Sequence, residues 1–241
     1  MKQAIAFSLY GSDLRYSVGA IKNAIIAEQI LDDEYELVFF VGQSVPSWVI
    51  STLRLFSNVQ IIQTDAPEDH TAKLWRFLAC ELDYDFVAFR DADARISLRE
   101  LHAHEQFLES GLDAHIMKDH PIGHNYPINA GMFTVRSALF KDIRALIESA
   151  EISDYYTQDQ DFLRNMIYPR IQFSCFVHDE FYDTQVEGKS VRKDYLIEPA
   201  NAISHIGAAL DENDRFIFAI DQQKSIALTG DDKYQYEWGM E

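Results

Sequence analysis

The segment Phe86-Val87-Ala88-Phe89-Arg90-Asp91-Ala92-Asp93-Ala94-Arg95 joins a short apolar run to two acidic residues. A continuous apolar run such as 86–89 is typical of a strand that is buried on both faces. Asp91 and Asp93 follow it directly and are two positions apart, so both side chains can point to the same side of an extended segment. In parallel α/β sheets, ligands bind at the carboxyl ends of the strands. The segment therefore predicts a buried strand that ends in two carboxylates at a binding edge.

Strand-like and helix-like segments alternate along the chain. Strands are expected at 2–9, 35–41, 59–63, 86–89, 115–117 and 132–135, and apolar residues recur at helical spacing over 18–25, 48–55, 74–82, 98–108, 140–147 and 162–167. This alternation favours an α/β layered fold with a mainly parallel sheet. No linker rich in Gly, Pro or Ser interrupts the 241 residues, so we expect one domain, with an acidic, aromatic tail from Asp231 that packs back or frays.

Several residues are candidates for the ends of these helices. Gly11-Ser12-Asp13 predicts a turn and a helix cap after the first strand. Ser97 and Glu100 have the spacing of a capping box, in which each residue bonds the backbone of the other. Ser137 is expected to cap the helix over 140–147, and Pro169 to mark the end of the helix over 162–167.

Charge and composition exclude some partners. The 39 acidic and 21 basic residues give a net charge of −18, which disfavours nucleic acid and anionic lipid as partners. The first residues lack the pattern of a secretory peptide, and no apolar run reaches the ~20 residues that a membrane span needs. Cys80 and Cys175 lie in apolar runs and are expected to be core residues without a disulfide. We therefore expect a soluble, cytoplasmic protein whose membrane association, if any, is peripheral.

The two carboxylates allow two interpretations. Hard oxygen ligands at the end of a strand suit Mg²⁺ or Mn²⁺ together with a diphosphate, and such an ion would neutralise an anionic substrate locally in an acidic protein. Alternatively, Asp91 and Asp93 form a solvated acidic turn before the helix that begins near Ser97.

The segment 86–95 resembles the DxD segment of GT-A glycosyltransferases, particularly bacterial and viral sugar transferases with an "RDADSR" form. Further segments resemble that family in the same order along the chain. They are Ile5 to Tyr10 with Gly11-Ser12-Asp13, Trp75-Arg76-Phe77, Asn129-Ala130-Gly131-Met132-Phe133, Tyr156-Thr157-Gln158-Asp159-Gln160-Asp161-Phe162-Leu163, and His205-Ile206-Gly207. The resemblance implies a GT-A-like, Rossmann-type three-layer fold, with residues 1–95 as the nucleotide-binding half and 96–241 as the sugar and acceptor half.

The same resemblance implies a function and a set of site residues. It implies transfer of a sugar from a nucleotide-sugar donor, such as a UDP-sugar, to a saccharide or lipid-linked acceptor, in the biosynthesis of a surface polysaccharide. The implied metal ligands for Mn²⁺ or Mg²⁺ are Asp91, Asp93 and His205. The implied donor-binding residues are Tyr10, Gly11, Arg76, Asp91, Asn129, Ala130 and Gly131, and the implied catalytic residues are Asp159, Gln160 and Asp161.

Each of these assignments has a plainer alternative. His205 is either a metal ligand or diphosphate contact, or a structural residue. Asp159 either faces the sugar or is only a helix cap, and the choice between Asp159 and Asp161 stays open. Lys73 and Arg76 are three apart on one helix face. Lys73 either meets nucleotide or sugar groups or pairs with Asp69 or Glu81.

Other basic and histidine residues surround these motifs. Arg90 and Arg95 flank the acidic pair and could simply pair with its carboxylates. His102, His104, His115, His120 and His124 lie close in sequence, but no HExxH or CxxC pattern indicates a zinc site. The loop with Asp119, His120 and His124 is either an acceptor-docking loop or a solvated one.

Two other functional classes remain. A sugar-phosphate nucleotidyltransferase also uses a nucleotide, Mg²⁺ and carboxylates, but it begins with a Gly-rich, basic loop, which Gly11-Ser12-Asp13 is not. A non-catalytic binding protein with a GT-A fold is the other, because a fold does not guarantee activity. No Walker A or GxGxxG sequence is present, which disfavours an ATPase or a dehydrogenase.

Overall fold

The computed structural model describes residues 1–121, 123–150, 158–181, 192–194 and 205–218. Its strands are β1 (Gln3–Leu9), β2 (Tyr35–Val41), β3 (Val59–Gln63), β4 (Phe86–Phe89), β5 (Ala114–Lys118), β6 (Phe133–Arg136), β7 (Cys175–Asp179) and β8 (Arg192–Asp194). Its helices are α1 (Leu14–Ile30), α2 (Ser47–Leu53), α3 (Leu98–Ser110), α4 (Ile143–Ser149), α5 (Gln158–Phe162) and α6 (Tyr168–Ile171), with 3₁₀ helices η1 (Ala72–Glu81) and η2 (Ser137–Phe140) and a π-helical turn η3 (Leu163–Ile167).

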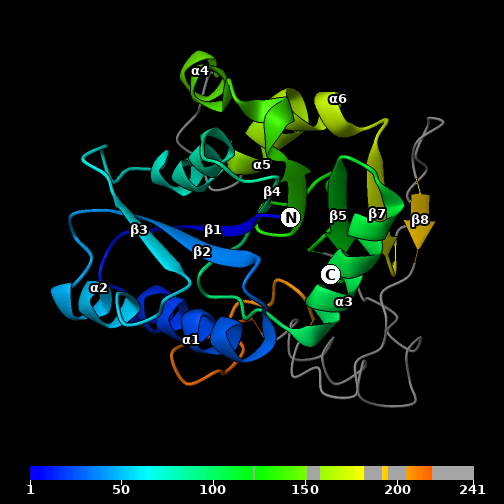
Figure 1. Ribbon diagram of the computed structural model, residues 1–241. Coiled ribbons are helices and arrows are strands. Elements are labelled where there is room, and N and C mark those ends of the chain that lie inside the picture. Colours follow the sequence, from blue (N-terminus) through cyan, green and yellow to red (C-terminus); the bar gives the residue numbers. More distant parts are fainter. Residues whose placement is uncertain (122, 151–157, 182–191, 195–204, 219–241) are drawn as a thin grey trace, which may run out of the picture.

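The strands form one sheet in the order β3-β2-β1-β4-β6-β5-β7-β8 (Figure 1). β6 runs antiparallel to both of its neighbours, β4 and β5, and the other pairs are parallel. Helices α1, α2 and α3 cover one face, while η1, α4, α5 and α6 cover the other. The predicted α/β fold with a mainly parallel central sheet and three layers is confirmed.

The core is divided by the alternation of side chains along the central strands. Phe7 of β1 packs with Phe39 of β2 toward α1 and α2, with ring centroids 4.7 Å apart. On the opposite face, Phe89 of β4 lies 5.0 Å from Phe77 of η1 and 4.7 Å from Phe133 of β6. This aromatic cluster fixes the end of β4 from which Asp91 and Asp93 follow.

Helix α1 begins as predicted after the Gly11 turn, with the Asp13 carboxylate accepting from the Arg15 amide at 2.9 Å. The helix buries small residues rather than its large apolar ones, and Ile25 is exposed. A Cβ at Gly19 would lie 2.1 Å from the Ala92 carbonyl oxygen. Small residues thus let α1 lie directly against the Asp91–Asp93 turn.

Two predicted helix caps differ from the structure. Ser97 caps α3 by accepting from the Glu100 amide at 3.3 Å, but the Glu100 carboxylate forms a buried ion pair with Arg90 instead of closing the capping box. Ser137 does not cap α4, because its hydroxyl donates to the Tyr84 carbonyl and it lies in η2. The first turn of α4, whose backbone amides a cap would bond, begins only at Ile143 and lies beyond the reach of Ser137.

The predicted end of the helix at Pro169 is wrong. The helical segment from Gln158 continues through η3 into α6, which extends to Ile171, and Pro169 lies in the first turn of α6. Proline lacks the backbone N–H that would otherwise donate to the preceding turn of this continuous segment. The π-helical turn absorbs the change in hydrogen bonding that the missing donor imposes.

Cys80 and Cys175 are buried free thiols, as predicted. Among the helices described, none combines the length and the apolar composition that crossing a bilayer requires. The expectations for the tail from Asp231, and for Tyr156 and Thr157 of the family-like segment, lie outside the described residues.

Candidate active site

The carboxyl ends of β1 and β4 are neighbours, because these strands pair in parallel. Tyr10 and Gly11 follow β1, and Asp91 and Asp93 follow β4. The antiparallel β6 begins beside the same edge, and Gly131 precedes it with a φ of +76°. A Cβ at this glycine would lie 2.3 Å from Asp91 Oδ2. The close approach of the 129–131 segment to Asp91 therefore requires glycine.

The buried Arg76 contacts Asp91, the backbone at Arg90 and Asp159 at this edge. Its side chain is 3% exposed, and its Nη1 donates to Asp91 Oδ1 at 2.5 Å and to the Arg90 carbonyl oxygen at 2.9 Å. Its Nη2 lies 3.9 Å from Asp159 Oδ2. Burial opposes the charge of Arg76, but Asp91 and then Asp159 outweigh it and raise the pKa of the guanidinium. One buried cation thus lies between two predicted site carboxylates.

Asp93 is nearly buried, whereas the Asp91 side chain is 48% exposed. Burial and then the charge of Asp91 raise the pKa of Asp93 to about 7, while Arg15, whose Nε lies 3.7 Å from Asp93 Oδ2, opposes the rise. Two like charges that repel each other in a poorly solvated site are relieved by a bound cation. Asp91 and Asp93 therefore fit a divalent ion that prefers oxygen ligands.

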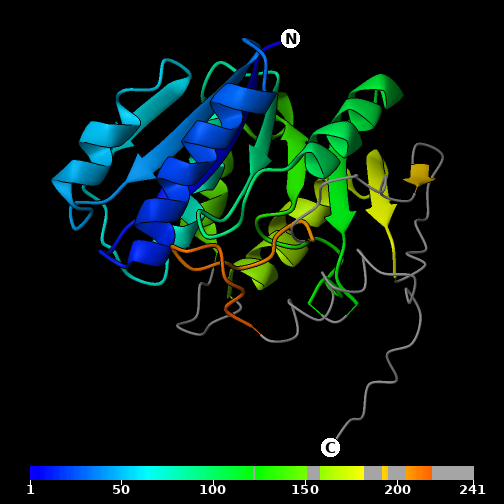
Figure 2. The ribbon, with the colours of Figure 1, turned by 90° about the horizontal axis from the view of Figure 1, so that it is seen from below.

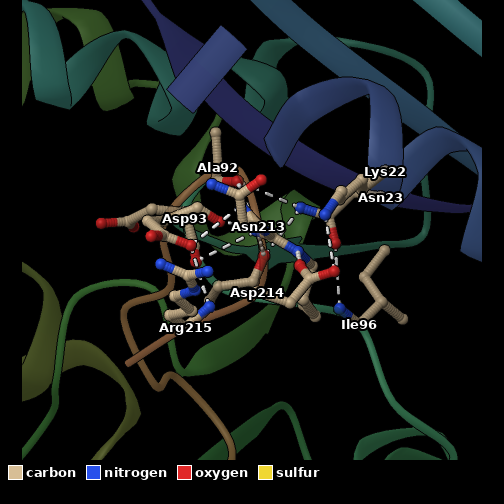
Figure 3. Close-up of polar contacts among 11 residues, drawn as sticks. Lys22, Asn23, Ala92, Asp93, Ile96, Asn213, Asp214 and Arg215 are labelled. Atoms are coloured by element: carbon tan, nitrogen blue, oxygen red, sulfur yellow. Dashed lines mark hydrogen bonds and ion pairs between the residues drawn. The ribbon is translucent and has the colours of Figure 1, made fainter. Parts of the chain in front are cut away.

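The backbone around Asp93 is fixed by α1. The buried Asn23 donates to the Ala94 carbonyl at 2.8 Å and accepts from the Ile96 amide at 3.0 Å. Figure 3 shows Asn23 and Lys22 approaching the Ala92–Asp93 turn from the same helix. A side chain that bonds both sides of a turn limits the positions that the turn can adopt, so Asp93 is presented on a rigid support.

The segment at the start of α5 separates the two acids that the sequence left open. Asp159 Oδ1 lies 3.8 Å from Lys73 Nζ, and its other oxygen faces Arg76. Asp161 pairs with Arg164 at 2.8 Å. Both side chains are partly exposed, Asp161 at 34% and Arg164 at 52%. Asp159 thus faces the edge with Asp91, and Asp161 pairs along its own helix. Lys73 pairs with Asp159 rather than with the neighbouring acids considered as its alternative.

The 129–131 segment offers polar and small groups beside these charges. Asn129 is 4% exposed, donates to the Gly123 carbonyl at 3.2 Å, and has a buried Oδ1 without a partner among the described residues. The Ala130 amide donates to Gln160 Oε1 at 3.3 Å. Gln160 therefore ties the predicted donor-binding segment to the predicted catalytic one.

Tyr10 lies over the same edge. Its ring packs edge-on against Trp75, with centroids 5.7 Å apart. Burial raises the pKa of the Tyr10 phenol; Arg76 opposes that rise, and Asp91 and Asp159 add to it. Tyr10 thus lies close enough to Arg76, Asp91 and Asp159 for their charges to change the pKa of its phenol.

His205 lies in a buried histidine cluster. Its ring centroid is 4.8 Å from that of His120 and 5.8 Å from that of His124. The neighbouring Ile206 amide donates to Asp119, whose carboxylate also accepts two hydrogen bonds from the buried Arg99. The loop histidines are therefore buried and not solvated. In the part of the chain that the structure describes, no three His, Cys, Asp or Glu side chains converge to hold an ion by themselves.

The flanking arginines have other partners than the acidic pair. Arg90 forms its ion pair with Glu100 and donates to the Phe89 carbonyl at 2.6 Å. Arg95 pairs with Asp214 at 3.0 Å. Both arginines thus bond the backbone around Asp91 and Asp93 and form their ion pairs with other carboxylates.

Three residues of this site were not identified from the sequence: Arg15, Asn23 and Asp214. Arg15 had a signal, because a cation in the first turn of a helix is unfavourable beside the helix dipole unless it has an anionic partner. Asn23 had a weaker one, as a polar residue on the buried face of α1. Asp214 had none, since its partners lie more than a hundred positions away in sequence.

No family model matches the sequence, and no curated protein matches it. Solved structures do match. TarS 1–349 from S. aureus has a TM-score of 0.54 and 18% identity over 76% of this chain and 59% of that one. Its complex with UDP has a TM-score of 0.51, 15% identity, and covers 80% and 61%. Mannosyltransferase PcManGT from Pyrobaculum calidifontis, in complex with GDP-Man and Mn²⁺, has a TM-score of 0.51, 12% identity, and covers 83% and 57%.

At these identities the similarity concerns the fold, and the chain spans about three fifths of the length of those structures, between 57% and 61%. The shared part includes a mostly parallel sheet with helices on both faces, which is the architecture expected from the sequence. The chain shares the fold of these structures, which is the GT-A-like fold expected from the sequence.

Proposed function

We propose that the protein is a metal-dependent glycosyltransferase that moves a sugar from a nucleotide-sugar donor to a saccharide or lipid-linked acceptor. The observation that carries the proposal is the meeting of Arg76, Asp91, Asp93 and Asp159 at the carboxyl ends of β1 and β4. Similarly folded structures contain UDP, or GDP-Man with Mn²⁺, which supports a nucleotide-sugar donor. A UDP-sugar is the first candidate.

Asp91 and Asp93 are the residues that would hold Mn²⁺ or Mg²⁺, and His205 is proposed as a third ligand or a diphosphate contact. When bound, such an ion acts as a Lewis acid that stabilises the charge of the leaving diphosphate. Arg15 lies beside Asp93 and Arg76 beside Asp91, so each of the two proposed carboxylate ligands has a cation close by. These cations limit the accumulation of negative charge that a diphosphate brings to a protein of net charge −18.

Asp159 is the proposed catalytic carboxylate, and Gln160 and Asp161 support its segment. Asp159 faces Arg76 and Lys73 at the edge, whereas Asp161 pairs with Arg164. If the reaction inverts the configuration of the sugar, Asp159 takes the proton of the acceptor hydroxyl as a general base. If the reaction retains it, Asp159 positions the sugar and stabilises a cationic transition state.

The donor sugar is proposed to lie between Asp159 and the 129–131 segment. Asn129 has an unbonded amide oxygen there, and Gly131 leaves room beside Asp91. Tyr10 and Gly11 would contact the nucleotide part from β1. In this proposal residues 1–95 bind the nucleotide, residues 96–241 bind the sugar and acceptor, and the protein works in the cytoplasm in surface-polysaccharide assembly.

A thermal-shift panel of nucleoside diphosphates with and without Mn²⁺ tests the proposal. We expect one nucleotide to raise the melting temperature, and to do so only when Mn²⁺ is present, because ligands that bind the native state stabilise it. Asp93→Asn should abolish this shift and the transfer reaction, while Asp33→Asn, which changes the same charge at an exposed site, should leave both intact. A native protein that responds to no nucleotide contradicts the proposal.

A second assay separates this function from a nucleotidyltransferase. A nucleotidyltransferase releases pyrophosphate from a nucleoside triphosphate and a sugar phosphate, whereas a glycosyltransferase releases a nucleoside diphosphate from a nucleotide-sugar. Pyrophosphate release by the native protein would replace the proposed reaction with the other.

A further inference from the structure

A short hairpin near the end of the described chain lies against the turn with Asp91 and Asp93 (Figure 2, orange). It spans residues 209–217: Leu210 and Phe216 form an antiparallel bridge, and the Ile217 amide donates to the Ala209 carbonyl at 3.1 Å. The Leu210 amide donates to the carbonyl oxygen of Asp93 at 2.9 Å. The hairpin thus bonds directly to the backbone of the proposed metal ligand.

Asp214, at the tip of this hairpin, binds two cations from different parts of the fold. Its Oδ2 lies 2.5 Å from Lys22 Nζ of α1, and its Oδ1 lies 3.0 Å from Arg95 Nε, two residues after Asp93. The Arg95 guanidinium also donates to the Asp93 carbonyl at 3.1 Å and to the Asp211 carbonyl at 3.0 Å. Figure 3 shows Lys22, Asp93 and Asp214 together.

The backbone at Asp214 is adapted to this contact. Asp214 has a φ of +61°, and it is the one non-glycine residue with a positive φ in the described part of the chain. Aspartate tolerates this conformation better than most residues, although it is still uncommon. Such conformations persist when surrounding contacts hold them, and they concentrate at functional sites.

We infer that Asp214 is a positioning residue, which holds hairpin 209–217 on the Asp91–Asp93 turn and thereby fixes Asp93 for metal binding. The metal-binding part of this inference rests on the proposed function. Asp214 acts through Arg95 and through the hydrogen bond from Leu210 to Asp93, and does not itself touch the ion. His205 lies four positions before the hairpin in the chain, so the same contact also limits the movement of His205 away from the site.

Three variants of the full chain test this role. Asp214→Asn removes the charge and keeps tolerance of the left-handed backbone, whereas Asp214→Gly removes the charge and the backbone strain together. Glu212→Gln is the matched control, because it removes the same charge from the same hairpin. If the ion pairs matter, both Asp214 variants behave alike. If backbone strain matters instead, Asp214→Gly differs from Asp214→Asn.

The first measurement is hydrogen exchange of the peptides that cover 91–96 and 209–217. We expect faster exchange in both Asp214 variants and native exchange in Glu212→Gln. This measurement needs no ligand, so it tests the contact whether or not the proposed function is correct. Unchanged exchange in both Asp214 variants would overturn the inference.

The second measurement is Mn²⁺ binding, followed by electron paramagnetic resonance, with Mn²⁺ alone and with UDP or GDP added. We expect about fivefold weaker Mn²⁺ binding in both Asp214 variants, since two partly exposed ion pairs each contribute modestly. Faster exchange with native Mn²⁺ affinity would overturn the positioning role and leave a hairpin anchor only. A native protein that binds no Mn²⁺ under any of these conditions would refute the proposed function together with the metal-positioning part of the inference, while the exchange data would still decide the contact.

Discussion

The guanidinium of Arg76 lies 2.5 Å from the exposed carboxylate of Asp91, although the Arg76 side chain is itself almost completely buried. A buried arginine with a partly exposed partner places the cation under the site, while the other carboxylate oxygen of Asp91 lies against Gly131. Since arginine also bonds the Arg90 carbonyl and faces Asp159, one side chain sets the spacing between the proposed metal ligand and the proposed catalytic acid.

Replacement of Arg76 should therefore damage the site even when the positive charge is kept. Lysine keeps the charge but lacks the planar fork that reaches two acceptors at once. We expect Arg76→Lys to lower kcat/KM about tenfold to a hundredfold, as hydrogen bonds to charged groups are worth ~1.5–3 kcal/mol. Arg144→Lys is the control, because Arg144 forms an exposed ion pair with Glu81. Equal kcat/KM values for both variants would contradict the role of Arg76.

Gly131 and Gly111 form a matched pair for testing the close approach to Asp91. Both have left-handed backbones, with φ of +76° and +71°, so alanine strains each by a similar ~1–2 kcal/mol. A Cβ at Gly131 meets Asp91 Oδ2 at 2.3 Å, whereas one at Gly111 has no atom within 4 Å. We expect Gly131→Ala to lose more stability than Gly111→Ala in urea unfolding, because its Cβ must also displace Asp91, and only Gly131→Ala to lose the Mn²⁺-dependent nucleotide shift. Loss of that shift in Gly111→Ala as well would contradict this explanation.

The lowered pKa of His104 should make the free energy of unfolding fall as the pH drops below neutrality. It is buried on α3, accepts or donates a hydrogen bond with Gln3, and lies near Tyr35, Arg90 and His115. Burial, and then the charge of Arg90, lower the pKa of His104 to about 3 in the folded state. The unfolded chain takes up this proton below pH ~6.5 and the folded chain does not, so the free energy of unfolding falls as the pH drops from ~6.5 toward 3.

The measurement is urea unfolding of the native protein and His104→Gln at pH 7.5 and pH 5. Glutamine keeps a hydrogen-bonding group but cannot titrate, so between these pH values the variant should lose about 2 kcal/mol less stability than the native protein. Comparing the two proteins cancels the other titrating groups that they share. Identical pH dependence would contradict this explanation, because it would show that folding does not lower the pKa of His104.

The two cysteines should be unreactive in the folded protein. Burial raises the pKa of the Cys80 thiol to about 12 and that of Cys175 to about 11, so neither provides the reactive thiolate near neutral pH. A thiol reagent such as dithiobis-nitrobenzoate should therefore detect no fast thiol in native protein and two after denaturation in guanidinium. Rapid labelling of either thiol before unfolding would contradict the burial described.

The fold could be predicted from the sequence where local pattern determines it. The apolar runs at 35–41 and 86–89 became strands with those bounds, because a strand buried on both faces requires such residues, and the run at 59–63 became the half-buried strand β3 at the end of the sheet order. The cap at Ser137 and the helix end at Pro169 were wrong. Tertiary contacts decide these positions: Ser137 bonds Tyr84 from a distant segment, and a π-helical turn accommodates Pro169.

Only part of the candidate site could be placed from the sequence. Asp91 and Asp93 follow a recognisable strand, so their place at the sheet edge followed from the pattern. The direction of Asp159 did not, because the position of α5 depends on the packing of Phe162 against Phe77 of η1 on the same face of the sheet. Asp214 was not predictable at all, since a hairpin of polar residues carries no periodicity and its partners are remote in sequence. The roles of all these residues in catalysis remain predictions that the experiments above test.

The position of β6 between β4 and β5 has a consequence for synthesis of the chain. During translation, β4 can pair with β1 as soon as both have emerged, but its other edge stays unpaired until residues 133–136 follow. At ~5–20 residues per second, that interval lasts for seconds. An unpaired, apolar strand edge invites pairing with another chain. The nascent protein is thus most prone to aggregate just after the proposed metal ligands have been made, and a fragment that ends near residue 95 would keep that open edge permanently.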